Sequence, residues 1–86
     1  MATWVVPVSW WVRCGNRQYK KQEMIPALPH IGMTAALFVR DSPAETFRIK
    51  DAMWDEATGF FWIELDDADA ETFSDRFEQD PHWELA

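Results

Sequence analysis

The feature that most constrains the fold is a two-residue alternation near the start of the chain, in WVVPVSWWVRC at residues 4–14. Every second side chain from Trp4 to Cys14 is apolar, whereas the positions between them include a proline, a serine and an arginine. A period of two sends alternate side chains to opposite faces of a strand, so this stretch predicts a long strand with one buried face. Pro7 has no N–H to donate to a neighbouring strand, and it predicts a sheet edge or a bulge at which the strand bends.

Four further strands and one helix are expected downstream. Short apolar or alternating stretches bounded by turn-forming residues predict strands at 18–25, 33–39, 45–54 and 60–66. Ala70, Phe73 and Phe77 recur at helical spacing, which predicts a helix over 68–79. Asp66 or Asp67, at the end of the last strand, would cap that helix.

This order of elements predicts a mainly β (α+β) protein that forms a single domain over residues 1–86. Strands that follow one another directly tend to pair as antiparallel neighbours, so we expect a five-stranded antiparallel, SH3-like half-open barrel. The one C-terminal helix would cover an open side of that barrel. The alternative is a flat meander with the helix packed on one face.

The stretch FRIKDAMWDEATGFFWIELDD, residues 47–67, predicts a hairpin rich in large aromatic side chains. If residues 55–59 form the loop, with Gly59 in the left-handed conformation, apolar side chains gather on one face and opposite charges pair on the other. The register is then Trp54–Phe60, Met53–Phe61, Ala52–Trp62, Asp51–Ile63, Lys50–Glu64, Ile49–Leu65 and Arg48–Asp66. Asp51 misfits, because it falls on the core face. A bulge at residues 51–52 or a position near the sheet edge would turn it outward, and the alternative is a carboxylate held in an apolar setting.

In that register Trp54, Phe60 and Trp62 share the outward face, and Trp11 of the first strand is outward as well. An aromatic cluster rimmed by charged side chains is typical of a contact surface. These four residues are therefore the candidate site for contact with a ligand or partner. Three possibilities stay open: the helix covers them, a second copy of the chain covers them, or they are free for another partner.

Charge is unevenly distributed along the chain. The net charge is −7, yet residues 1–40 carry five basic side chains against one acidic, and residues 41–86 carry fourteen acidic against three basic. An acidic whole argues against nonspecific nucleic-acid binding, which depends on neutralising phosphates. The N-terminal apolar run is too short to span a bilayer and lacks the basic start of a signal peptide, so we expect a cytoplasmic protein without a membrane partner. The single Cys14 cannot form an intramolecular disulfide and is expected to be a buried, reduced thiol.

Catalytic and metal-binding motifs are not found. His30 and His82 are the only histidines and lack metal-ligand spacing, and three scattered glycines form no phosphate-binding loop. Asp66, Asp67 and Asp69 are better explained as a helix cap and a solvated face than as a cation site. We therefore expect no metal site and no cofactor.

Part of the pattern resembles a known group of proteins. The stretches that carry the resemblance lie within residues 28–66: PHIGM at 29–33, FRI at 47–49, WD at 54–55 and FWIEL at 61–65. Together they resemble small SH3-like barrel orphan proteins of bacteria and phage, of the kind carried by mobile integron gene cassettes. The resemblance implies a barrel fold, a bacterial cytosol and an accessory role, and it transfers no functional residue.

Two functions from different classes follow. The first is a noncatalytic binding or interaction module that uses Trp54, Phe60 and Trp62, with Trp11, to bind a second copy, a peptide or protein, or a small molecule. The alternative is an acidic inhibitor or regulator that presents residues 64–80 to a basic protein partner. A small enzyme built on Asp51 and His30 is the third and least favoured interpretation.

Overall fold

A computed structural model describes residues 5–40 and 44–86 of the chain. Its elements, in chain order, are β1 (Val6–Cys14), β2 (Arg17–Ile25), β3 (Thr34–Leu37), β4 (Glu45–Asp55), β5 (Phe60–Leu65), α1 (Ala70–Gln79) and β6 (Glu84–Leu85). The five predicted strands and the helix are all present. Trp4, the first residue of the predicted first strand, lies outside the described residues.

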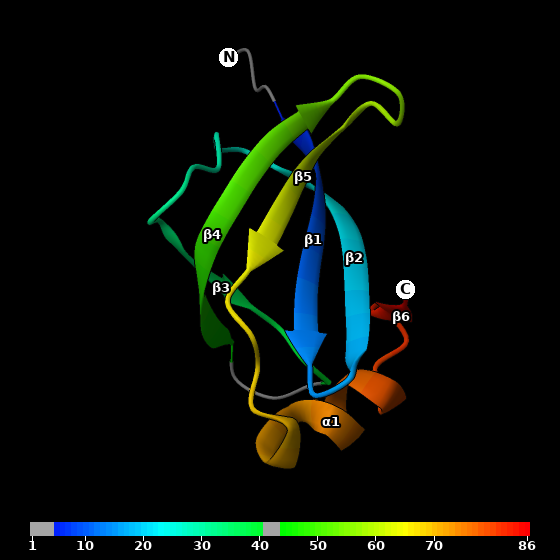
Figure 1. Ribbon diagram of the computed structural model, residues 1–86. Helices are drawn as coiled ribbons and strands as arrows, with labels where there is room; N and C mark the ends of the chain where they lie inside the picture. The colour runs from blue at the N-terminus through cyan, green and yellow to red at the C-terminus, as the bar shows by residue number, and fades with distance from the viewer. Residues whose placement is uncertain (1–4, 41–43) are drawn as a thin grey trace.

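The strands form one mixed, six-stranded sheet in the order β3-β4-β5-β1-β2-β6, curled into a half-barrel (Figure 1). The predicted five-stranded antiparallel barrel is therefore wrong in strand number and in strand direction, and the flat meander is wrong as well. β1 pairs with β5 in parallel, from Val8 opposite Phe61 to Trp11 opposite Glu64. Four reversals of direction separate these two strands along the chain, so they point the same way when the curled sheet brings them together. The sixth strand is a two-residue segment after the helix that pairs with β2.

The burial pattern of β1 confirms the predicted alternation of buried and outward side chains. Its core-facing side chains are all buried: Val6, Val8, Trp10, Val12 and Cys14. β1 is an interior strand between β2 and β5, but Pro7 precedes its first pair with β5, so on that side Pro7 lies at a local edge, and the ladder with β2 has no bulge there. The carbonyl of Arg13 accepts a hydrogen bond from the N–H of Ala68, so the backbone groups of Arg13 point to the β5 side of the strand. Backbone direction alternates along a strand, so the backbone groups of Pro7 point to the same side. The pairs with β5 begin only at Val8, so the missing N–H of Pro7 costs no ladder bond.

The β4–β5 hairpin keeps part of the predicted register and shifts the rest by one residue. Ile49 lies opposite Leu65 as predicted, but Asp51 lies opposite Glu64 and Trp54 opposite Phe61. A bulge between Ile49 and Asp51 absorbs the extra residue, which is Lys50.

The turn of this hairpin explains the shift. Asp55 belongs to the strand rather than to the loop, and its carboxylate accepts hydrogen bonds from the Ala57 N–H (3.1 Å) and the Thr58 hydroxyl (2.9 Å). The Gly59 N–H closes the loop onto the Asp55 carbonyl at 2.9 Å, with Gly59 at a φ of 76°. The left-handed glycine is confirmed, and the loop is one residue shorter than predicted.

Helix α1 closes the lower end of the half-barrel, beneath the β1–β2 turn (Figure 1). Its N-terminal cap is Asp69 and not the predicted Asp66 or Asp67, because the chain runs on as far as Ala68, whose N–H donates to Arg13 of β1. Phe77 is fully buried there, with its ring centroid 5.1 Å from that of Tyr19 and 5.0 Å from that of Trp83. The apolar face of the helix thus packs against the core at the lower end of the half-barrel.

Phe77→Ala tests how much this packing of the helix contributes to stability. Removing a fully buried phenylalanine leaves a cavity, and we expect the free energy of unfolding to fall by about 3–5 kcal/mol. Phe38→Ala is the matched control, because Phe38 is 63% exposed and its loss should cost less than about 0.5 kcal/mol. Denaturant unfolding followed by tryptophan fluorescence measures both. Equal losses in the two variants would contradict the role given to α1.

Candidate functional site

Two of the four predicted contact residues lie together on the convex, outer face of the sheet. The indole rings of Trp11 on β1 and Trp62 on β5 stack with centroids 4.1 Å apart and planes within 5° of parallel. The parallel β1–β5 register brings them together, because Ser9 lies opposite Trp62 and the next outward residue is Trp11. The Trp11 indole N–H donates to the Ser9 hydroxyl at 2.9 Å, which fixes the ring along its own strand. Both tryptophans are partly buried.

The stack is the centre of a longer row across four strands. The ammonium group of Lys20 on β2 lies 5.5 Å from the Trp11 ring centroid, within the range of a cation–π contact. On the other side, Met53 of β4 lies opposite Trp62 and is 54% exposed. We call Lys20, Trp11, Trp62 and Met53 the convex row. The sequence analysis placed neither Lys20 nor Met53 in the site.

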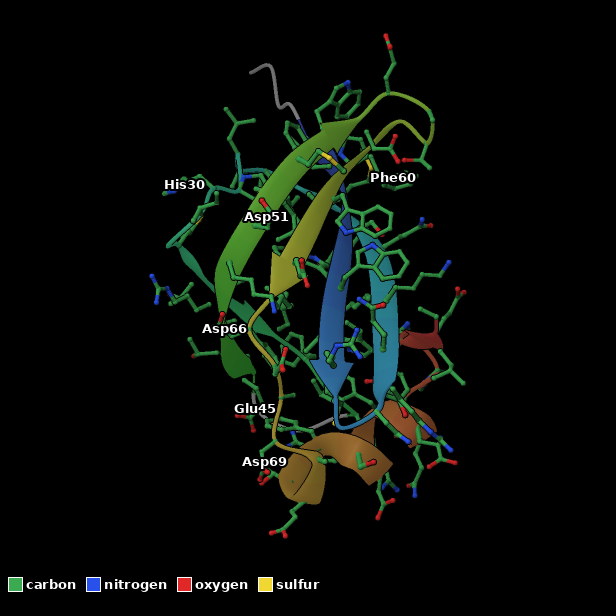
Figure 2. All side chains as sticks on the ribbon, in the orientation of Figure 1. His30, Glu45, Asp51, Phe60, Asp66 and Asp69 are labelled. Atoms are coloured by element: carbon green, nitrogen blue, oxygen red, sulfur yellow. The ribbon has the colours of Figure 1, made fainter. Side chains whose placement is uncertain are left out.

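Trp54 lies on the other face of the sheet. The bulge at Lys50 pairs it with Phe61, whose strand neighbours Val8 and Ile63 are in the core. The Trp54 and Phe61 rings meet edge-on at 5.2 Å, at the open end of the half-barrel, where Trp54 is 51% exposed. Phe60 stays on the convex side with Trp62, at the start of β5 near the hairpin loop (Figure 2). The predicted cluster of four is therefore divided between two faces.

Charged side chains border the convex row. Lys50, at the bulge, lies 3.5 Å from a carboxylate oxygen of Glu64 and 3.5 Å from one of Asp67. The predicted charge contact between Lys50 and Glu64 therefore forms, although Asp51 and not Lys50 lies opposite Glu64 in the ladder. Desolvation alone would lower the pKa of Lys50, but the negative charges of Glu64 and Asp67 outweigh it and raise that pKa. All three groups are open to solvent, so these ion pairs add little to stability. Arg48 meets Asp66 through the backbone, where the Asp66 N–H donates to the Arg48 carbonyl.

Helix α1 does not cover the convex row. Its aromatic contacts are with Tyr19, Phe47 and Trp83 at the lower end of the barrel. Of the three possibilities for the outward aromatics, cover by the helix is therefore wrong.

The residues considered for catalysis do not form a site. Asp51 is turned outward by the bulge, as the sequence allowed, and its carboxylate accepts from the N–H of Ala52 at 3.0 Å. His30 is exposed in the loop before β3, and among the described residues no hydrogen bond joins it to Asp51 (Figure 2). Within residues 5–40 and 44–86 no group of three His, Cys, Asp or Glu side chains is placed to hold a metal ion. Asp67 instead pairs with Lys50, and Asp69 accepts from the Thr72 hydroxyl at 2.6 Å.

Two acidic residues that the sequence analysis passed over hold important positions. Asp80 is 5% exposed and follows α1, where its carboxylate accepts from the N–H groups of Arg40 and His82. An aspartate that accepts from the N–H two residues on is a common turn, so the DPH sequence at 80–82 could have revealed it. Glu23 accepts from the indole N–H of the buried Trp10 at 2.7 Å.

No protein-family model matches this chain, and no curated protein or solved structure is similar enough to it to count as a relative. Within the described part of the chain no helix has the length and apolar character needed to cross a membrane. Function is therefore argued from geometry.

Cys14 offers a direct test of the packing between β1 and the helix. It is 2% exposed, and burial, followed by the negative charge of Asp69, raises the pKa of its thiol. Because the thiolate is the reactive form, we expect a disulfide reagent at neutral pH to label the folded protein more than about ten-fold slower than the unfolded chain. The folded-state pKa is raised, so the neutral thiol favours folding at neutral pH, and this contribution is lost as the pH rises through the folded pKa. Fast labelling of the folded protein at neutral pH would contradict the placement of Cys14.

Proposed function

We propose that the protein is a noncatalytic interaction module whose convex face binds a second copy of the chain. The observation that carries the proposal is the convex row, in which stacked tryptophans and an exposed methionine cross the outer face without cover from α1. Aromatic side chains and methionine are enriched in protein interfaces. Methionine is flexible enough to adapt its shape to a partner surface.

The charges around the convex row favour a copy of the same chain as the partner. A two-fold interface brings the same patch together twice, so the patch must complement itself. This face offers both signs of charge, with Lys20 and Lys50 beside Asp51 and Glu64. A typical stable interface buries about 800 Å² from each partner. That is about a seventh of the 5654 Å² of surface that the protein exposes, so one face of the sheet is large enough.

Met53→Glu tests the proposal without breaking the tryptophan stack. A carboxylate at the β4 end of the row, beside Trp62, would be desolvated and repelled in a dimer, and we expect the dimer dissociation constant to rise by about ten-fold or more. Thr46→Glu is the matched control, because it adds the same charge to an exposed site on the same strand away from the row. Light scattering after size exclusion, at low and high salt, gives the mass. A wild-type monomer at all accessible concentrations, or a dimer equally stable in both variants, would rule out self-association through this face.

The acidic C-terminal half supports a second candidate, an inhibitor or regulator that binds a basic protein. Its motivating observation is the exposure of acidic side chains along residues 64–80: Asp66, Asp67, Asp69, Glu71, Asp75 and Glu78. Opposite charges steer association at low salt and lose strength as salt screens them.

A lysine-rich test peptide distinguishes the two candidates. If the acidic surface is the site, exchanging Glu71 and Asp75 for Gln and Asn should weaken salt-sensitive binding of the peptide by about three-fold or more, and Met53→Glu should not. Binding that is the same at low and high salt would exclude this candidate.

The cytoplasmic location and the kinship with SH3-like orphan proteins of mobile gene cassettes stay predictions. An accessory role would suit a small binding module of either kind.

A further inference from the structure

The half-barrel has an open seam between β2 and β3. The C-terminal segment covers the outer edge of β2 as far as Lys20, so in the described part of the chain residues 21–25 pair with β1 alone. β3 pairs with β4 on one side and, among the described residues, with no strand on the other. These two edges are the ends at which a further strand would close the sheet. We call the gap between residues 21–25 and 34–37 the β2–β3 seam.

The ladder of β2 shows which of its backbone groups point into the seam. The Gln18 carbonyl accepts from the Ala86 N–H, on the β6 side of the strand. β2 pairs with β1 without a bulge, so every second residue after Gln18 points its N–H and C=O to the same side. The backbone groups of Gln22 and Met24 are therefore directed outward, toward the seam.

The same reasoning fixes the free edge of β3. The Met33 carbonyl accepts from the Ile49 N–H, so Met33 and the alternate residues after it face β4. Thr34 and Ala36 then point their backbone groups toward the seam. The Phe38 carbonyl, next in this series, already accepts from the Trp83 indole N–H at 3.0 Å.

The chain's own C-terminal segment shows how the seam is filled lower down. β6 runs antiparallel to β2 at the lower end, and Trp83, just before it, is 4% exposed. The Trp83 indole reaches across to Phe38, while the Lys21 ammonium group lies 5.6 Å from its ring centroid. An indole thus spans from β2 to the end of β3 and holds the two edges apart. Above Trp83 the same gap has no such filling segment within residues 5–40 and 44–86.

A mainly apolar cavity of about 290 Å³ occupies this upper part. Its walls include Trp10, Ile25, Met33, Ala35 and Leu37, and among the described residues Glu23 is the single charged one that lines it. This volume is at the lower end of the range of ligand pockets, about 300–1,000 Å³, so it suits a few side chains rather than a folded element. The hydrogen bond from buried Trp10 holds the Glu23 carboxylate in place, and Lys21 approaches its second oxygen only to 3.9 Å.

We propose that the β2–β3 seam binds an extended segment of a partner protein as an additional strand, antiparallel to β2 and in line with β6. Strand addition of this kind takes its affinity from the backbone ladder and its selectivity from pockets for alternate side chains. Here the ladder groups are those of Gln22 and Met24. The side chain opposite Glu23 enters the cavity, so a lysine or arginine at that position complements the carboxylate. A small apolar side chain two residues before it lies opposite Ile25 and matches the remaining walls, whereas Trp83 already fills the position beside Lys21.

Glu23 and Lys21 also explain why this open edge need not pair indiscriminately. Charged side chains that point inward beside an unpaired edge discourage aggregation, because an unmatched strand would bury an uncompensated charge. The same charge favours a segment that carries the opposite sign.

A synthetic peptide, acetyl-TVTRT-amide, is the probe for the test, and it ends before the position that Trp83 occupies. Antiparallel to β2, its arginine lies opposite Glu23, and the two threonines beside the arginine lie opposite Gln22 and Met24. We expect saturable binding, measured by NMR titration, with the largest amide shifts at Gln22, Met24, Thr34 and Ala36. The peptide with glutamate in place of arginine should bind about ten-fold more weakly or worse. N-methylation of the two threonines beside the arginine should abolish binding, because those N–H groups form the ladder.

Two pairs of variants complete the experiment. Gln22→Pro removes a seam-facing N–H without touching the β1 ladder and should abolish binding, whereas Gln22→Ala keeps the N–H and should bind within about two-fold of the original. Glu23→Gln keeps an acceptor for Trp10 and should remove the preference for arginine over glutamate. Met53→Glu should leave peptide binding unchanged, so the experiment can reject the peptide site in the seam and the dimer interface at the convex row independently.

Several outcomes would overturn the proposal. They are the absence of saturable binding, amide shifts confined to the Trp11–Trp62 face, or equal affinity for the N-methylated peptide. A seam whose amides shift with protein concentration alone would make a second copy the occupant instead. If Gln22→Pro lowers the stability of the fold, the N-methylated peptide alone tests whether backbone hydrogen bonds hold the peptide, because it requires no change in the protein.

Discussion

The parallel pairing of β1 with β5 is the interaction on which the rest of the structure depends. Within residues 5–40 and 44–86 it is the only strand pairing that joins the β1–β2 hairpin to the β3–β4–β5 unit. It brings the apolar sides of both units around one core, with Val8, Ile63 and Leu65 fully buried. It also stacks Trp11 on Trp62 on the opposite face, a contact of the kind that adds about 0.5–1.5 kcal/mol beyond simple burial. Core and outer surface are thus organised by the same few backbone hydrogen bonds.

Local patterns in the sequence were sufficient to predict the individual elements. Alternation found β1 and its buried face, helical spacing found α1, and Gly59 located the hairpin turn. These predictions succeeded because each depends on residues that are close together in the chain. The pairing of β1 with β5 depends on residues about fifty positions apart, and no local pattern encodes it. A two-residue strand such as β6 has too few residues to show any period.

The candidate site was predicted only in part, for a related reason. Trp11 and Trp62 were recognised because both are outward on their own strands, which alternation determines. Trp54 was misplaced because the carboxylate of Asp55 folds back on the turn and shortens the loop by one residue. Glu23 has a role set by a distant partner, Trp10, so its neighbours in the sequence reveal little about it. For Asp80 the local turn at 80–82 was readable, but the contact with the distant Arg40 was not. The positions of the candidate site residues therefore depend on contacts that form only in the folded chain, and the sequence alone does not reveal those contacts.

The bulge in β4 has a consequence for how the length of this strand can vary. At Lys50 the strand carries one residue more than β5 needs, and all later pairs of the hairpin are already in step with their partners. Loss of that residue would leave Ile49 opposite Leu65 and Asp51 opposite Glu64, as they are now. The change would reduce the local twist, because bulges increase it, but would leave every side chain on its present face. Position 50 is thus a place where a one-residue deletion would alter the curvature of the sheet and leave the same side chains on each of its two faces.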